Sequence, residues 1–160
     1  MKNNITFISP TFGKISFKDV LDNIINYMNE NADDEYNIAV GTDSQNTNKT
    51  KVVVVICIHR KGKGGRYFYY SESVKKLKDI RTKIYYETEI SLDISKEINN
   101  ELYKNTNINY TFNIHADIGE NGDSHKLINE IVGWVESEGF NCCIKPKSYV
   151  ASTIADRMSK

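Results

Sequence analysis

The alternation of apolar and polar residues predicts one helix and then three strands in the first half of the chain. Apolar residues recur at helical spacing over residues 16–29, behind a serine that suits a helix cap. Three apolar and largely β-branched runs follow, at 36–42, 52–60 and 66–71. Because a polar loop and a glycine-rich turn join these runs, we expect three neighbouring antiparallel strands.

The second half of the chain alternates helices with strands. The pattern predicts helices over 74–104, from residue 123 or 124 to 139, and over 148–158, with strands at 107–116 and 140–144. Strands separated by helices are expected to be parallel and joined by right-handed crossovers. This order predicts an α/β fold, a five-stranded mixed sheet flanked by helices. We expect one domain over residues 1–160, with an N-terminal helical extension over 1–35.

The composition excludes several classes of protein. The chain has 160 residues, enough for one domain with its own core, and 21 basic residues balance 21 acidic ones. This balance excludes a strongly basic nucleic-acid tail and an acidic disordered chain, but it says nothing about local charged patches. The longest apolar run has only the length of a strand, and the start lacks an apolar signal segment. We therefore expect no membrane partner.

The cysteines indicate a reducing compartment. Cys57, Cys142 and Cys143 are odd in number, two of them are adjacent, and they form neither a disulfide framework nor a zinc motif. A cytoplasmic location is expected. The abundance of Lys, Asn and Ile is typical of AT-rich coding and favours a bacterial or phage source.

Two aspartates directly follow predicted strands. Asp43 comes after the strand at 36–42, and Asp117 comes after the strand at 107–116. If these strands are parallel neighbours, both carboxylates emerge at the same edge of the sheet, where open α/β sheets bind ligands. Either aspartate alone is equally consistent with a turn residue or a helix cap.

Glu87 lies at the centre of the inward stripe of the long predicted helix. That stripe comprises Ile80, Ile84, Glu87, Ser91, Ile94 and Ile98. A carboxylate on a buried face is costly unless it is paired or bound to a metal. An ion pair with Arg81 or Lys83 is the alternative interpretation. Glu89 lies about 200° further around the helix and is expected to face water.

A fourth acidic residue, Asp156, lies in the last predicted helix, where spacing alone indicates a surface position. Four carboxylates within reach of one another would constrain the chemistry, since each pair about 4 Å apart repels by roughly 4 kcal/mol at an effective dielectric of 20. Such a cluster requires divalent cations or raised pKa values. Oxygen ligands favour Mg²⁺ or Mn²⁺, and two such ions about 3.5–4 Å apart are typical of nucleases and polymerases.

Three segments carry a resemblance to a known family. They read GTDSQ at 41–45, HADIGENG at 115–122, and a closing string at 139–160 that contains IKPKSY and ADRMSK. These segments resemble the YkuK-type family of ribonuclease H-like proteins, whose architecture also matches the predicted order of elements. The resemblance extends from about residue 36 to the end of the chain.

The resemblance implies a role for each of the four carboxylates. Asp43 resembles the first-strand catalytic aspartate of ribonuclease H folds, Asp117 the fourth-strand aspartate, and Asp156 the final-helix aspartate. Glu87 falls where the first-helix glutamate belongs, and Glu89 is its rival. The implied cofactors are two Mg²⁺ or Mn²⁺ ions.

Other polar residues near this edge are candidate substrate contacts. They are Ser44, His115, His125, Lys145, Lys147, Arg157 and Lys160. For His115 a partly buried strand histidine is the simpler interpretation, and for the charged residues solvated surface is. The turn KGKGGR at 61–66 is a further candidate phosphate-binding tip, although a plain hairpin turn is the simpler interpretation.

These observations lead to a functional hypothesis and its rivals. The first is a metal-dependent nuclease that hydrolyses phosphodiesters of RNA, DNA or a hybrid, with Asp43, Glu87, Asp117 and Asp156 as ligands. The alternative is a nucleic-acid-binding or scaffolding module that keeps the fold without the chemistry. A relative of the actin-like ATPases ranks last, because it needs a second domain of similar size.

Overall fold

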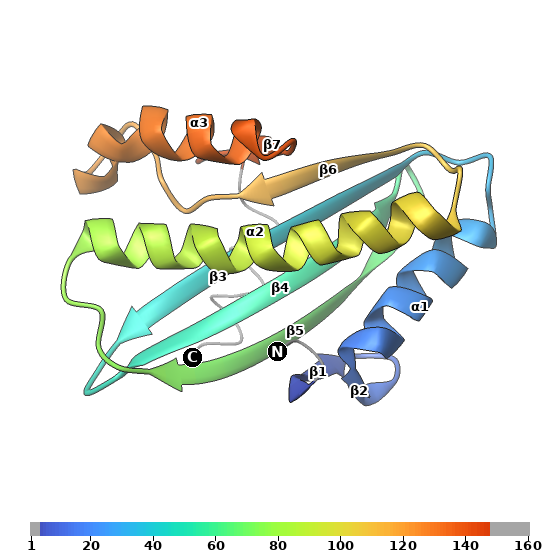
Figure 1. Ribbon diagram of the computed structural model, residues 1–160, viewed down its shortest axis with the longest axis horizontal. Coiled ribbons are helices and arrows are strands. Elements are labelled where there is room, and N and C mark those ends of the chain that lie inside the picture. The colour runs from blue at the N-terminus through green and yellow to red at the C-terminus, as the bar shows by residue number, and fades with distance from the viewer. Residues whose placement is uncertain (1–3, 148–160) are drawn as a thin grey trace.

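The sheet has seven strands. The computed structural model describes residues 4–147. The strands are β1 (Thr6–Ser9), β2 (Gly13–Ser16), β3 (Tyr36–Asn46), β4 (Thr50–Arg60), β5 (Gly64–Val74), β6 (Tyr110–His115) and β7 (Asn141–Cys143). They are arranged in the order β2-β1-β5-β4-β3-β6-β7 (Figure 1).

The mixed character of the sheet is confirmed, but the expected number of five strands is wrong. Strands β3, β4 and β5 form an antiparallel meander, and β6 and β7 continue the sheet in parallel from β3. The two extra strands, β1 and β2, form a hairpin that joins β5 through the pair Ile8 and Tyr69. Each has only four residues, too few for an alternating pattern to stand out from the sequence.

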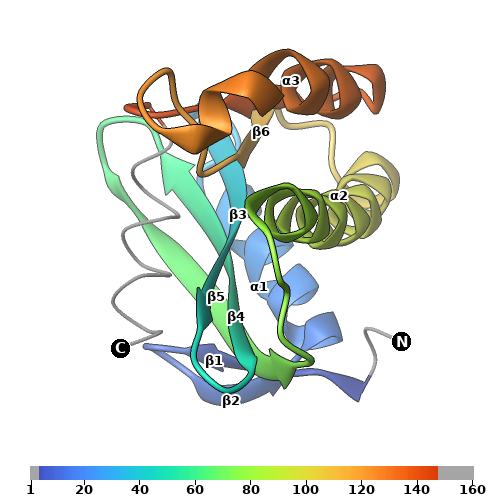
Figure 2. The ribbon, with the colours of Figure 1, turned by 90° about the vertical axis from the view of Figure 1, so that its left-hand side faces the viewer.

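Two helices cover one face of the sheet. They are α1 (Phe17–Asn29) and α2 (Ile80–Asn105) (Figures 1 and 2). Ser16 caps α1 as expected: it accepts a hydrogen bond from the Asp19 amide while the Asp19 carboxylate accepts one from the Ser16 amide. Helix α2 begins six residues later than predicted, because β5 continues to Val74 and Asp79 supplies the cap.

The remaining helical segments lie beside β6 and β7. A short 3₁₀ helix, η2 (Asp123–Leu127), leads into α3 (Ile128–Ser137), and Gly139 then ends the helix with a φ of 93°. The predicted helix at 148–158 lies outside the described residues. None of the helices in the described range is long and apolar enough to cross a membrane.

The main core lies between the sheet and helices α1 and α2. Its fully buried members include Phe7, Ile24, Ile38, Ile56, Leu92 and Ile98. The opposite face of the sheet carries a smaller apolar cluster of Ala39, Val53, Val55 and Cys57, with Tyr67 and Tyr69 packed against it. Strand β3 therefore has buried residues on both faces, which explains why it reads as a continuous apolar run.

Candidate functional site

The candidate site begins where β6 stops and β3 continues. The last pair between these parallel strands joins Gly41 to His115, whereas β3 runs on against β4 as far as Asn46. Asp43 is thus inside a strand, paired with Val53, and not beyond its end as predicted. Asp43 still lies at an open edge of the sheet, because β6, the neighbouring strand on that side, ends at His115, level with Gly41. Asp117 follows β6 by two residues.

Alternating residues of β3 connect this edge to helix α2. The Ser44 hydroxyl donates a hydrogen bond to the Glu87 carboxylate, and the hydroxyls of Thr42 and Ser91 lie 2.8 Å apart. Both contacts are buried. Asp43 stands between Thr42 and Ser44, so its side chain leaves the strand on the other face. The two hydroxyl contacts fix where Glu87 lies relative to the strand.

Glu87 is buried at the point where α2 crosses the strand edge. Its side chain is 7% exposed, whereas Glu89 is exposed to solvent. The predicted inward stripe is buried from Ile84 through Ile98, and only its first member, Ile80, is exposed at the helix start. The helix phase inferred from the stripe therefore agrees with the structure.

Burial changes the acidity of Glu87. Desolvation raises the pKa of its carboxyl from 4.5 to about 8; the Ser44 hydrogen bond opposes this rise, and the charges of Asp43 and Asp117 reinforce it. The charge of Lys83, one helical turn away, lowers the pKa. An ion pair to Arg81 or Lys83 was the alternative interpretation, but Arg81 pairs with Glu130 at 2.9 Å, and no described cation lies within ion-pair distance of Glu87.

Asp117 already has a cationic partner. Lys145 Nζ lies 3.0 Å from Asp117 Oδ1, and both side chains are partly exposed. The Lys145 amide also donates a hydrogen bond to the Ile118 carbonyl, at 2.8 Å. Gly119 permits this approach, since a Cβ at that position would lie 3.1 Å from the Lys145 Cβ. The segment before Pro146 therefore delivers a lysine to the acidic edge.

The donor chemistry of this edge fits a hard divalent cation, although the side chains are not gathered around one point. Glu87 is a buried carboxylate with no cationic partner among residues 4–147, and Asp43 and Asp117 are near enough to raise its pKa. Within residues 4–147, however, no three His, Cys, Asp or Glu side chains converge as a metal-ligating group. Asp117 is turned to Lys145 and Glu87 to Ser44. Metal binding would require Glu87 and Asp117 to exchange partners, and the Asp43 carboxylate, which leaves β3 on the opposite face from Glu87, to reach them around the strand edge.

The remaining predicted contacts divide between the two faces of the sheet. Ser44 and Lys145 lie with the carboxylates, as described above. His115 is buried, while His125 is exposed on η2. Asp156, Arg157 and Lys160 lie outside the described residues.

The turn at 61–66 lies at the opposite end of the sheet from Asp43. Lys61 pairs with Glu35, Lys63 pairs with Asp34, and the Arg66 guanidinium stacks on Tyr27. The cations of this turn are therefore occupied within the protein, which agrees with the simpler interpretation of a hairpin turn.

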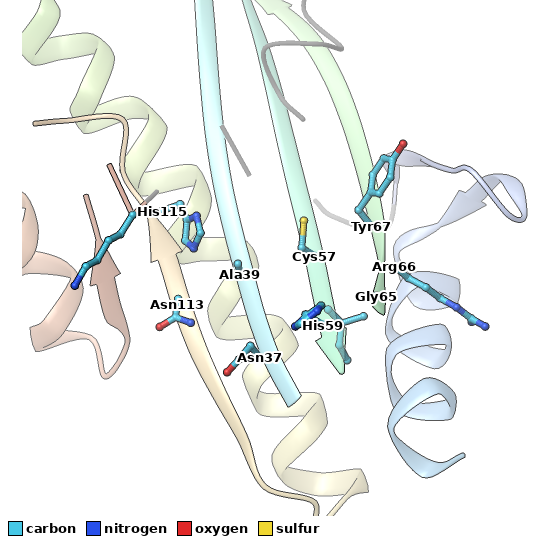
Figure 3. A pocket seen from close by; sticks show the side chains of 11 residues that line it. Asn37, Ala39, Cys57, His59, Gly65, Arg66, Tyr67, Asn113 and His115 are labelled. Carbon is cyan, nitrogen blue, oxygen red and sulfur yellow. The ribbon is translucent and has the colours of Figure 1, made fainter. Parts of the chain in front are cut away.

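A cavity lies on the face of the sheet away from α2. It measures about 440 Å³, and its floor is formed by the small residues Ala39 and Gly65 together with Cys57. His115 and Asn113 line one side and Tyr67 the other, while Arg66 points away from the cavity (Figure 3). Lys147 also lines the cavity. His115 thus contributes to this hollow, two residues along β3 from the level of Asp43.

Sequence reasoning missed several residues that shape the site. Thr42 and Ser91 form a buried polar contact beside Glu87, and Gly119 gives Lys145 its approach to Asp117. Ser91 was visible as a small polar residue on the inward stripe, one turn from Glu87. The role of Gly119 depends on its contact with Lys145, which is distant in the sequence, so no local sequence pattern predicts it.

The fold and this edge define the class of the protein. The chain belongs to the ribonuclease H-like family, whose model matches residues 19–160. It is similar to the uncharacterized protein YkuK of Bacillus subtilis (strain 168), with 29% identity over 172 aligned positions that cover the whole of both chains.

Proposed function

We propose that the protein is a divalent-metal-dependent nuclease that hydrolyses phosphodiester bonds of RNA, DNA or a hybrid. The observation that carries the proposal is Glu87, a buried carboxylate without a cationic partner among the described residues, beside Asp43 and Asp117. Such an arrangement is unfavourable for an apo protein and becomes favourable when a divalent cation binds. Membership of the ribonuclease H-like family supports the same conclusion.

Each residue has a defined part in this proposal. Asp43, Glu87 and Asp117 would hold Mg²⁺ or Mn²⁺, and the resemblance adds Asp156 as the fourth ligand. The chemistry that a pair of such ions supplies is activation of water and stabilisation of charge on the phosphate. The Ser44 hydroxyl orients the Glu87 carboxylate toward the strand edge. Lys145 neutralises Asp117 before metal binds, and afterwards its ammonium group is free to contact a phosphate oxygen.

The decisive experiment measures cleavage of labelled single-stranded RNA, single-stranded DNA and hybrid duplex with Mg²⁺, with Mn²⁺ and with EDTA. We expect metal-dependent cleavage that falls at least about 100-fold in Asp43→Asn and Glu87→Gln. The matched control is Glu89→Gln, an exposed carboxylate two residues away on the same helix, which should cleave like wild type. Equal activity of Asp43→Asn and wild type would refute the proposal.

One observation favours a second candidate, a nucleic-acid-binding module without catalysis. In the described part of the chain the carboxylates do not converge on one point, and Asp117 is paired with Lys145. A thermal-shift titration separates the two functions. A metal at about 100 times its dissociation constant adds roughly 2.7 kcal/mol to the free energy of unfolding. Oligonucleotide binding that persists in EDTA, with no metal-dependent stabilisation, supports the non-catalytic module.

A further inference from the structure

Four lysines gather at the end of the sheet that carries the acidic site. Lys49 lies in the turn between β3 and β4, and Lys75, Lys76 and Lys78 lie in the linker between β5 and α2. All four side chains are exposed. Figure 2 looks onto this end, where the turn and the linker lie next to each other. We call these four residues the lysine ridge.

Two hydrogen bonds hold the turn and the linker together. The Asn46 side chain donates to the Leu77 carbonyl at 3.0 Å, and the Leu77 amide donates to the Thr50 hydroxyl at 2.9 Å. Leu77 is half-buried, whereas its neighbours Lys76 and Lys78 are exposed. The linker is therefore anchored at its apolar residue and presents its lysines on both sides of that anchor.

The charges of the ridge are uncompensated, unlike those at the other end of the sheet. None of the four ridge lysines forms an ion pair with a residue described in the structure, whereas Lys61 and Lys63 at the far turn each pair with a carboxylate. Residues 75–83 hold five basic residues, of which Arg81 pairs with Glu130, and one acidic residue, in a chain with no net charge. That one acid, Asp79, is engaged as the cap of α2. The positive potential of the ridge is therefore available to an external anion.

The ridge lies close to the carboxylates. Asn46 is three residues beyond Asp43 on β3, about 10 Å along an extended strand. Asp79 is eight residues before Glu87 on α2, about 12 Å along the helix axis. With phosphates spaced about 3.4 Å apart along each strand of a duplex, these separations correspond to roughly three or four nucleotides.

We infer that the lysine ridge binds the phosphate backbone of a nucleic acid, three or four nucleotides away from the phosphodiester bond that lies at the acidic edge. This inference rests on the proposed function for its choice of ligand. The ridge attracts the negatively charged nucleic acid. Its contacts with the phosphates do not depend on base sequence, because flexible lysines present no fixed pattern to base edges. The positive charge of the ridge also offsets the repulsion between the phosphates and the carboxylates of the site.

The test compares two triple variants that remove equal charge at opposite ends of the sheet. The first is Lys75→Gln/Lys76→Gln/Lys78→Gln, and the control is Lys61→Gln/Lys63→Gln/Lys104→Gln. Lys104 is exposed in the last turn of α2, at the far end of that helix from the ridge. Both are made in an Asp43→Asn background, and binding of a fluorescein-labelled 20-nucleotide single strand is measured in EDTA at several salt concentrations. Under these conditions no cleavage occurs, so the result does not depend on the proposed chemistry.

The ridge variant should bind about 10- to 100-fold more weakly at low salt, and its salt slope should fall by about 2, since each lost phosphate contact removes about 0.7. The control should stay within about threefold of the parent. Equal weakening of both variants, or of neither, overturns the inference. The inference is also overturned if the oligonucleotide does not bind and the protein instead binds anionic phosphatidylserine vesicles through the ridge lysines.

A second measurement separates failure of the ridge from failure of the proposed nuclease. With Asp43 restored, the ridge variant should raise KM for cleavage and leave kcat within about threefold, because the ridge touches the substrate away from the reacting bond. If no variant cleaves but the ridge still governs binding, the ridge is upheld and the nuclease is refuted. If cleavage is present and both triple variants cleave and bind like the parent, the ridge is refuted alone.

Discussion

The hydroxyl of Ser44 donates a hydrogen bond to the carboxylate of Glu87, joining the middle of β3 to the inward face of α2. Both residues are buried, and they are 43 positions apart in the chain. This hydrogen bond favours the ionised form of Glu87, as the more distant charge of Lys83 also does. It therefore connects the geometry of the fold to the chemistry of the proposed site.

Replacing Ser44 with alanine should weaken metal binding as well as folding. Loss of the hydroxyl leaves the carboxyl buried without its donor, which raises the pKa of Glu87 further and costs about 1–3 kcal/mol in the free energy of unfolding. Metal affinity should fall about 10-fold or more, as is usual when a hydrogen bond that orients a ligand is removed. Urea unfolding and calorimetric Mn²⁺ titration measure the two effects.

Ser95→Ala is the matched control for this variant. Ser95 is fully buried on the same face of α2, and its hydroxyl has no hydrogen-bond partner among the residues that the structure describes. Its removal should leave metal binding unchanged and leave stability equal or slightly higher. A loss of Mn²⁺ affinity in Ser95→Ala equal to that in Ser44→Ala would contradict the specific role of Ser44.

The raised pKa of Glu87 predicts a pH dependence of stability. The folded state holds the Glu87 proton up to about pH 8, whereas the unfolded state releases it near 4.5, so the free energy of unfolding falls as pH rises through this range. Glu87→Gln removes this penalty. In EDTA, the free energy of unfolding of Glu87→Gln should rise relative to that of wild type as pH increases from 4.5 to 8, by on the order of 2–4 kcal/mol in total.

The measurement is urea unfolding of wild type, Glu87→Gln and Glu89→Gln at pH 5 and pH 8.5. Glu89→Gln should follow wild type at both values, because Glu89 is exposed. Added Mg²⁺ or Mn²⁺ should restore the stability of wild type at pH 8.5 and leave Glu87→Gln unaffected. A pH dependence shared equally by all three proteins would show that another group is responsible.

The helix part of the site was predictable from the sequence because it rests on a short-range pattern. Ile84, Ser91 and Ile94 place Glu87 inward by helical periodicity alone, and the structure agrees. The exception is Ile80, which is exposed because it is the first residue of α2. A periodic stripe specifies the direction of a side chain, but it does not determine where the helix begins.

The strand part of the site was only partly predictable. The parallel pairing of β3 with β6 was expected, and it brings Asp43 and Asp117 to one edge. The extension of β3 beyond Thr42 was not expected, because the residues DSQN at 43–46 are polar and strongly favour turns. These residues remain in a strand because β4 pairs with them throughout, and pairing of this kind depends on residues distant in the sequence.

Removing Lys145 should strengthen metal binding at Asp117. The ion pair of 3.0 Å occupies the carboxylate, and a divalent cation must displace it. Lys145→Ala should therefore raise Mn²⁺ affinity about threefold to tenfold, and it should change the free energy of unfolding by less than about 1 kcal/mol because the pair is partly exposed. Lys147→Ala is the control, since Lys147 is exposed two residues further along the chain and the described structure pairs Asp117 with Lys145 and not with Lys147. Unchanged affinity in Lys145→Ala would show that this pair does not compete with metal.

Gly119 and Gly133 should respond in opposite ways to substitution by alanine. A Cβ at Gly119 would lie 3.1 Å from the Lys145 Cβ, so Gly119→Ala should push Lys145 from Asp117 and cost about 1 kcal/mol in the free energy of unfolding. Gly133 lies inside α3 with open space around the added Cβ, and Gly133→Ala should stabilise the protein by about 0.5–1 kcal/mol through helix propensity. Thermal unfolding measures both changes. Gly119→Ala should also raise Mn²⁺ affinity as Lys145→Ala does, and an affinity equal to that of wild type would show that the lysine keeps its contact with Asp117.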